Sequence, residues 1–208
     1  MKKDKTNNNY NVITVGDSGV GKTSIICRYT QNKFYENVLS TMGVAKIARA
    51  LTLKNGQQIT LFLNDTAGQE KYNSLNKQYF NNADGALFVF DLNNKKSFKN
   101  IKTWITFTNE NKDIENDFPK YLVGNKKDLD RNIDEEEIEM FLEENKGYKY
   151  YEISAKDDNG NPINELFQDM GEDLFTFASK RKNSNKKKKS KVLEYKRQKA
   201  SICQKCIM

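Results

Sequence analysis

The stretch Gly16-Asp17-Ser18-Gly19-Val20-Gly21-Lys22-Thr23-Ser24 is the most informative part of the chain, because it carries the pattern G-x-x-x-x-G-K-[ST] in full. Its glycines let backbone N–H groups approach a polyphosphate, and the helix that follows directs its positive dipole end at the anion. The Lys22 ammonium is expected to reach the β- and γ-phosphates, and the Thr23 hydroxyl to ligate Mg²⁺. A glycine-rich turn that binds nothing is the alternative. The pattern favours a phosphate-binding loop at residues 16–24.

The segments on either side of this loop have the secondary structure that it requires. Residues 10–15 are rich in β-branched side chains and predict a strand. Ile25, Ile26 and Tyr29 have helical spacing and predict a helix that ends near Gln31. A strand, a glycine-rich loop and a helix in this order form the context in which such a loop binds phosphate.

A second motif indicates which base is bound. The pattern N-K-x-D stands at Asn125, Lys126 and Asp128, directly after the apolar run 121–124. A carboxylate accepts hydrogen bonds from the N1–H and 2-amino groups of guanine, and adenine offers neither donor. A site built on such donors rejects the analogue that lacks them by about 10⁴-fold. In isolation the motif also fits a solvated loop, but beside a phosphate loop it favours guanine recognition.

A third cluster lies between these two motifs. Asp65 ends the alternating strand 59–64, where its carboxylate suits a Mg²⁺ ligand that acts through a water molecule. Gly68 is expected to offer its N–H to a γ-phosphate, and Gln69 to orient an attacking water. Phosphoryl transfer asks a protein mainly for positioning and charge stabilisation, so these few groups suffice for hydrolysis.

With these residues the chain resembles the Rab family of Ras-superfamily small GTPases, over residues 10–180. Ser18 and the segments 71–75, 79–83 and 87–91 resemble Rab stretches more than Ras or Rho ones. The resemblance implies that Phe34 stacks on the guanine and that Thr41 closes over Mg²⁺ and the γ-phosphate. It also implies a last base-contact loop at Ser154, Ala155 and Lys156, with the Ala155 N–H near the guanine carbonyl oxygen.

The resemblance further implies a binary switch with GTP/GDP and Mg²⁺ as ligands. Its partners would be a GTPase-activating protein, an exchange factor, effectors, a dissociation inhibitor or escort, and a prenyl transferase, all acting on a monomer. The expected effector region consists of Val38, Leu39, Ser40, Thr41, Met42, Gly43, Val44, Ala45 and Lys46. The chain departs from the family here: Lys46 and Asn64 replace two aromatics of a triad, and only Tyr79 remains.

Patterning predicts an α/β fold, a P-loop GTPase domain with a six-stranded, mostly parallel sheet and helices on both faces. Asn55-Gly56, between the strands 44–53 and 59–64, predicts a hairpin and hence one antiparallel edge strand. Asp134 with Glu137 predicts a capping box, and Asn161-Pro162 predicts the start of a helix. That helix has one apolar stripe, made of Ile163, Leu166, Phe167, Met170, Leu174 and Phe177.

The positive charge of the chain is concentrated at its C-terminal end. Residues 180–208 hold twelve Lys or Arg against the single acid Glu194, a net charge of +11, so residues 1–179 carry −4 of the total +7. We therefore expect a flexible N-terminus (1–9), a GTPase domain (10–179) and a disordered polybasic tail (180–208). A nucleic-acid role is disfavoured, because Tyr195 is the only tail aromatic that could stack on a base.

Two cysteines near the end, Cys203 and Cys206, favour lipid attachment over the alternatives. They are too few for a zinc site, and prenylation combined with a basic patch gives firm binding to an anionic membrane. Cysteine is not fourth from the end, so the modified residue stays open. Cys27, on the helix after the phosphate loop, is expected to be a small buried residue.

Composition excludes several other classes of protein. The chain has no histidine, which removes imidazole catalysis and His-ligated metals. It has no apolar run of about 18 residues and no secretory signal, and Lys2 excludes N-myristoylation. We expect a switch in vesicle trafficking, on the cytoplasmic face of an intracellular or plasma membrane and cycling with the cytosol. A Ras- or Rho-type signalling GTPase and a poorly hydrolysing nucleotide-dependent scaffold are the alternatives.

Overall fold

The computed structural model describes residues 8–36, 43–66, 79–110, 118–157 and 161–182 of the 208-residue chain. The chain divides into two compact units, Met1–Leu174 and Phe175–Met208. The described part of the second unit is helical, and in it the Arg181 guanidinium lies 5.8 Å from the centre of the Phe177 ring.

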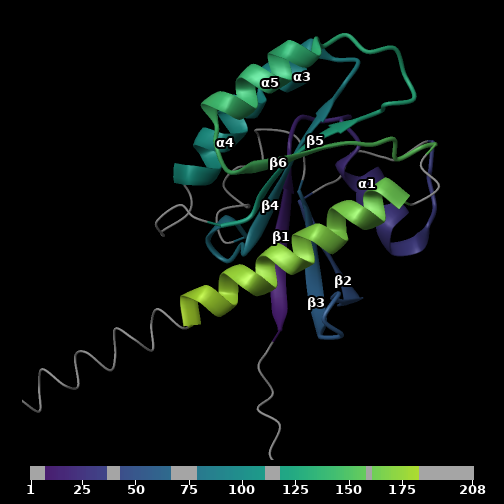
Figure 1. Ribbon diagram of the computed structural model, residues 1–208. Coiled ribbons are helices and arrows are strands. Elements are labelled where there is room, and N and C mark those ends of the chain that lie inside the picture. Colours follow the sequence, from purple (N-terminus) through teal and green to yellow (C-terminus); the bar gives the residue numbers. More distant parts are fainter. Residues whose placement is uncertain (1–7, 37–42, 67–78, 111–117, 158–160, 183–208) are drawn as a thin grey trace, which may run out of the picture. The chain divides into compact units, whose positions relative to one another are not determined.

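Within the described residues, the first unit is built on a six-stranded sheet (Figure 1). Its strands are β1 (Asn9–Val15), β2 (Val44–Thr52), β3 (Gln58–Thr66), β4 (Gly85–Asp91), β5 (Lys120–Asn125) and β6 (Tyr148–Glu152), in the order β2-β3-β1-β4-β5-β6. The β2–β3 pair is antiparallel, and every other pair is parallel. This arrangement confirms the predicted mostly parallel sheet with one antiparallel edge strand.

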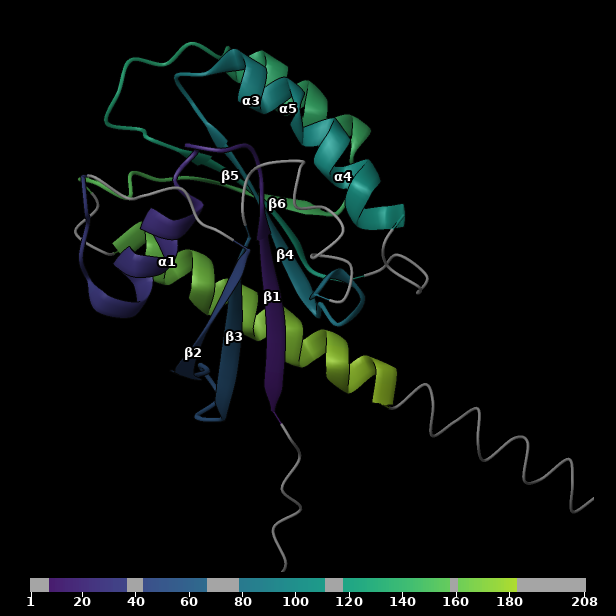
Figure 2. The same cartoon turned by 180° about the vertical axis from the view of Figure 1, so that it is seen from behind.

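Helices cover both faces of the sheet (Figures 1 and 2). Within the first unit they are α1 (Lys22–Gln31), α3 (Lys95–Lys99), α4 (Ile101–Glu110), α5 (Glu135–Glu144) and the last helix, over residues 161–174. Residues 79–81 are helical as well. On one face α1 packs against the last helix, where the Tyr29 and Phe167 rings stack at 3.9 Å. On the other face, Phe98 of α3 lies 4.9 Å from Phe90 of β4 and 5.6 Å from Phe141 of α5.

The core forms where the strands are covered on both sides. Every residue of β4 is buried, as expected of a central parallel strand. The stripe predicted on the last helix is confirmed within the first unit, because Ile163, Leu166, Phe167, Met170 and Leu174 are at most 1% exposed. Two tyrosines add polar ties to this helix: the Tyr121 hydroxyl donates to Asp173, and the Tyr151 hydroxyl donates to Asp169 at 2.6 Å.

The hairpin between β2 and β3 closes as its sequence predicts. The Leu53 N–H donates to the Gln57 carbonyl at 2.8 Å, and the Gly56 N–H donates to the Leu53 carbonyl at 2.9 Å. Gly56 has a φ of +80°, a conformation that glycine adopts without a steric penalty. The turn makes β2 the edge of the sheet beside β3.

The start of α5 differs from the predicted capping box. Asp134 is the N-cap residue with extended backbone angles, but its side chain makes no capping hydrogen bond. Glu137 forms an ion pair with Lys95 of α3 instead, and this partner lowers the pKa of Glu137. A charged partner on the neighbouring helix competes successfully with the uncharged N–H of the cap.

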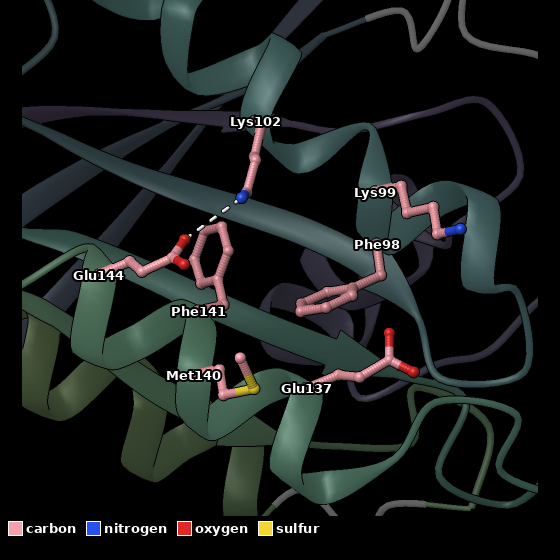
Figure 3. A pocket seen from close by; sticks show the side chains of 7 residues that line it. All are labelled: Phe98, Lys99, Lys102, Glu137, Met140, Phe141 and Glu144. Carbon is pink, nitrogen blue, oxygen red and sulfur yellow. Dashed lines mark hydrogen bonds and ion pairs between the residues drawn. The ribbon is translucent and has the colours of Figure 1, made fainter.

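Helices α3, α4 and α5 bound a hollow on the surface (Figure 3). Phe98 and Phe141 form its apolar floor, and Lys102 of α4 bridges its end by an ion pair of 3.2 Å with Glu144 of α5. The Met140 side chain is 61% exposed at this hollow. The ion pairs Lys95–Glu137 and Lys102–Glu144 connect α5 to α3 and to α4.

Candidate nucleotide-binding site

The predicted site lies at the carboxyl ends of the parallel strands. β1, β3, β4 and β5 end at Val15, Thr66, Asp91 and Asn125, and the pairing register places these ends along one edge of the sheet. Open α/β sheets bind their ligands at this edge. The three motifs identified in the sequence lie at the ends of β1, β3 and β5 and in the loops that follow them, and Ser154, Ala155 and Lys156 follow β6.

The glycines of the phosphate loop are required by close contacts on both sides. A Cβ on Gly16 would lie 2.1 Å from the carbonyl oxygen of Val89 on β4. A Cβ on Gly21 would lie 2.2 Å from the Asn125 side-chain amide, and the φ of Gly21 is +95°. Gly21 is also the N-cap of α1, so the helix begins directly at the loop with its N–H groups directed at the predicted phosphate position.

Lys22, the first residue of α1, is buried with 6% of its surface exposed. Its ammonium donates to the carbonyl oxygens of Gly16 at 2.9 Å and Asp17 at 2.8 Å. Burial lowers the pKa of Lys22 to about 8, while the charges of Asp65 and Asp17 act in the opposite direction. The amine is therefore held inside the loop, where the negative charge of a bound phosphate would stabilise its protonated form.

The two described residues predicted to bind magnesium lie in contact. The Thr23 hydroxyl donates to Asp65 Oδ2 at 2.6 Å, although the residues are 42 positions apart in the sequence. Asp65, near the end of β3, is only 2% exposed. A hydroxyl beside a carboxylate is a set of hard oxygen ligands, and Mg²⁺ is commonly bound by one or two such groups together with water and phosphate. The residues present therefore fit this ion.

Asn125 joins the phosphate loop to the base-contact loop. Its amide Nδ2 donates to the Val20 carbonyl at 2.8 Å, and its Oδ1 accepts the Ala155 N–H at 3.1 Å. The side chain is 1% exposed. In this structure the Ala155 N–H, expected near a guanine oxygen, therefore has a protein acceptor. Asn125 acts here as a brace between two loops.

The remaining base-contact residues meet at the surface. The Ser154 hydroxyl donates to Asp128 Oδ1 and accepts the Asp157 N–H at 2.9 Å. Asp128 is exposed, so its carboxylate is open to a ligand. Lys126 has a φ of +64°, and its ammonium lies 2.8 Å from Asp91 Oδ2 at the end of β4. These contacts orient the loop that follows β5.

The structure describes only some of the residues predicted for the guanine contact and the effector region. Phe34 lies after α1 and is half-buried, and Gly43, Val44, Ala45 and Lys46 lead into and begin edge strand β2. The predictions for Val38, Leu39, Ser40, Thr41, Met42, Gly68, Gln69, Cys203 and Cys206 fall outside the described residues. Cys27 is only half-buried, which corrects the expectation of a buried side chain, because it faces away from the buried stripe of Ile25, Ile26 and Tyr29.

The two positions that depart from the Rab pattern have polar roles in the sheet. Asn64 is 1% exposed, and its Nδ2 donates to the carbonyls of Val12 at 3.1 Å and Phe62 at 3.2 Å. The Lys46 ammonium donates to Asn11 Oδ1 at 3.0 Å and lies 4.4 Å from the centre of the Phe62 ring. At both positions the polar side chain that replaces an aromatic ring is hydrogen-bonded. Asn64 donates to two backbone carbonyls, and Lys46 donates to the side-chain amide of Asn11.

Sequence reasoning missed residues that lie outside the motifs and donate hydrogen bonds to them. Arg28 of α1 donates to the carbonyls of Ala155 at 3.0 Å and Lys156 at 2.8 Å. Asn100 and Trp104 both donate to the Asp17 carboxylate. These contacts join positions 83 to 128 residues apart, and no local motif announces such pairs.

Among the described residues, no helix has the length and apolar character needed to cross a membrane.

Comparison with known proteins agrees with this geometry. The model of the Ras family matches residues 11–176. The chain is 40% identical to Ras-related protein Rab-11B of Dictyostelium discoideum over 169 residues, which cover 79% of this chain and 74% of that protein. It is 35% identical to a probable Rab-related GTPase of Acanthamoeba polyphaga mimivirus over 173 residues, 82% and 78% of the two chains.

Similarity to a human protein is of the same order. The chain is 40% identical to human Ras-related protein Rab-9B over 151 residues, which cover 71% of this chain and 74% of that one. The region that matches the family model contains all three motifs and all of the described sheet except the first two residues of β1. The chain therefore belongs to the Ras superfamily of small GTPases and is of the Rab type.

Proposed function

We propose that the chain binds GTP and GDP with Mg²⁺ at the carboxyl edge of the sheet and hydrolyses GTP slowly, as a switch in vesicle trafficking. The contact between Thr23 and Asp65 carries this proposal, because it unites the phosphate loop with the strand that precedes the predicted γ-phosphate contacts. Asp128, on the loop after β5, supplies the acceptor for the base, and Ser154, on the loop after β6, donates to the Asp128 carboxylate.

The division of labour follows from the chemistry of the side chains. Lys22 supplies positive charge to the phosphates, and Thr23 and Asp65 would hold Mg²⁺, which neutralises phosphate charge when bound. Thr41 and Gly68 would be drawn inward by the γ-phosphate and released after hydrolysis, as in other nucleotide switches. Ordering of the segments around these two residues is the signal that a partner would detect.

Hydrolysis in isolation is proposed to be slow. Gln69 is the residue assigned to orient the attacking water, and unassisted turnover in this class is on the order of 10⁻⁴ to 10⁻³ s⁻¹. An activating protein would raise this rate by completing the charge stabilisation of the transition state. A single-turnover assay on Gln69→Leu should show retained GTP binding and slower cleavage. An unchanged rate would remove Gln69 from the mechanism.

Membrane attachment is proposed to come from the C-terminal residues. A prenyl group on Cys203 or Cys206 gives reversible binding on its own, and a basic patch makes that binding firm. Each cation of 180–208 near an anionic surface adds up to about 1 kcal/mol, screened by salt. Replacing both cysteines by serine should release a tagged copy from membranes. Unchanged membrane recovery would contradict lipid anchoring.

Partners are proposed to be an exchange factor, an activating protein, effectors, an escort and a prenyl transferase. The exposed ammonium of Lys46 on edge strand β2 favours effectors that recognise a positive charge there, whereas the buried Asn64 amide is occupied by backbone carbonyls. Affinity capture with the GTP-bound form tests the trafficking role. Retention of vesicle-tethering proteins supports it, and retention of signalling kinases would favour the signalling alternative.

A further inference from the structure

The carboxylate of Asp17, the second residue of the phosphate loop, is held by two donors on one helical turn. Asn100 Nδ2 donates to Asp17 Oδ2 at 2.7 Å, and Trp104 Nε1 donates to Asp17 Oδ1 at 2.8 Å. Hydrogen bonds to an ionised carboxylate are about twice as strong as those between neutral groups. Both oxygens of Asp17 are thus bound by side chains that precede or belong to α4.

The two donors are placed by the start of that helix. Asn100 and Trp104 are four residues apart, so their side chains lie on one helix face, and the Trp104 N–H donates to the Asn100 carbonyl at 3.1 Å. The indole is 7% exposed and packs edge-on against Phe107, with ring centres 6.4 Å apart. An indole N–H is a donor only, so losing Asp17 would leave it buried without this acceptor.

Asp17 is also held through its main chain. Its carbonyl oxygen accepts the Lys22 ammonium at 2.8 Å, so one residue connects α4 to the lysine that begins α1. The loop around it contains three glycines with positive φ, which lose much conformational freedom when they become ordered. Anchoring one loop residue in advance lowers the cost of ordering the loop around a ligand.

The hydrogen bonds from Asn100 and Trp104 also fix where the Asp17 carboxylate points. An unheld carboxylate at the second loop position would be free to approach a bound polyphosphate and repel it. Asn100 and Trp104 direct this negative charge toward α4. Releasing the carboxylate therefore harms phosphate binding twice, through a looser loop and through a nearby like charge.

We propose that Asn100 and Trp104 are positioning residues that lengthen the residence time of bound nucleotide by holding Asp17. The proposal rests on the nucleotide-binding function proposed above and extends it to side chains that do not touch the ligand themselves. We call the two hydrogen bonds from Asn100 and Trp104 to the Asp17 carboxylate the lock. Both bonds are made by side chains, so each can be removed by a single substitution.

A double-mutant cycle tests the proposal on the full chain with Mg²⁺ and a fluorescent GDP analogue. Trp104→Phe keeps the aromatic ring and removes the donor, and it should speed dissociation about tenfold. Asn100→Ala, at a half-buried position, should speed it about fivefold. In an Asp17→Ala background each change should have less than a twofold effect. Equal factors in both backgrounds would overturn the proposal, since a general loss of packing acts regardless of Asp17.

Two further measurements separate the lock from general stability and from the function itself. Thr106→Ala removes an exposed hydrogen bond to Lys102 on the same helix and should leave dissociation unchanged. Trp104 is the only tryptophan, so its emission should change on nucleotide removal in the parent and not in Asp17→Ala. A parent chain that retains no GDP analogue would overturn both proposals, whereas retention with additive mutations would overturn the lock alone.

Discussion

The phosphate half and the base half of the site are built differently. Lys22 and Asp65 are 6% and 2% exposed, and the loop between β1 and α1 is held by contacts to β3, β4, β5 and the start of α4. Asp128 and its neighbour Leu129, which is 47% exposed, lie at the surface. We therefore expect the phosphate half to be shaped before the ligand arrives, and the base half to be completed by the ligand.

This contrast assigns affinity and selectivity to different places. We expect charged groups in the buried half to interact strongly with phosphate, because little water would screen them. An exposed carboxylate is worth less until a base covers it, so the discrimination against adenine should lie below the limit of a fully buried site.

Lys22→Met should weaken GDP binding on the order of 10⁴-fold, because two or more charge-assisted contacts to phosphate are lost. The same change should stabilise the nucleotide-free fold by about 1 to 3 kcal/mol, since burial opposes the charge of Lys22. Titration with a fluorescent GDP analogue and denaturant unfolding measure the two quantities. A variant that loses affinity and stability together would show that Lys22 is mainly structural.

Asp128→Asn should lower the preference for guanine over adenine by about 10³-fold, with less effect on phosphate contacts. The substituted amide accepts one hydrogen bond and donates another, so it suits a base with a carbonyl at carbon two. Competition by xanthosine diphosphate should therefore improve in this variant. Equal loss of affinity for all three nucleotides would mean that the base half supports the fold and does not select the base.

Alkaline pH should separate binding from stability without any mutation. The pKa of Lys22 is about 8 in the folded chain, against an ordinary value of 10.5. Between these values the unfolded chain binds more protons, so the contribution of Lys22 to stability rises with pH across this window. Binding needs the charged amine, and GDP affinity should fall by up to about tenfold for each pH unit above 8.

The Lys22→Met variant is the control for this pH dependence. Its stability profile should lack the rise between pH 8 and 10.5 that the parent shows, because the group that titrates is gone. A rise of the same size in both chains would assign the effect to other groups. Isothermal titration and chemical unfolding at matched pH values provide the comparison.

Arg28→Ala should speed GDP dissociation about fivefold, because the loop of Ala155 and Lys156 loses two carbonyl contacts. Arg49→Ala is the matched control: its guanidinium donates to the Thr30 carbonyl at the end of the same helix and lies 5.6 Å from the Tyr29 ring centre. Stopped-flow dissociation should distinguish the two variants. Identical rates would show that Arg28 does not support the base half.

The fold could be predicted in outline from local signals. The Asn55-Gly56 turn, the loop after β1 and the stripe on 161–174 each follow from neighbouring residues, and the structure confirms them. The capping box at Asp134 was wrong because Lys95, 42 positions before Glu137, competes for its carboxylate. Asn100 and Trp104 could not be found, because their partner Asp17 lies on another element. A local motif identifies the residues expected to contact the ligand, whereas the residues that support the motif are identified only by contacts between distant parts of the chain.

A competition titration with GTP and ATP measures whether the carboxyl ends of the strands bind the phosphates strongly while Asp128 selects guanine. The full chain, loaded with a fluorescent GDP analogue in Mg²⁺, is titrated with each nucleotide. GTP should displace the analogue at about equal concentration, and ATP should require at least about 10³-fold more. Displacement by ATP at the same concentration as GTP would contradict the account.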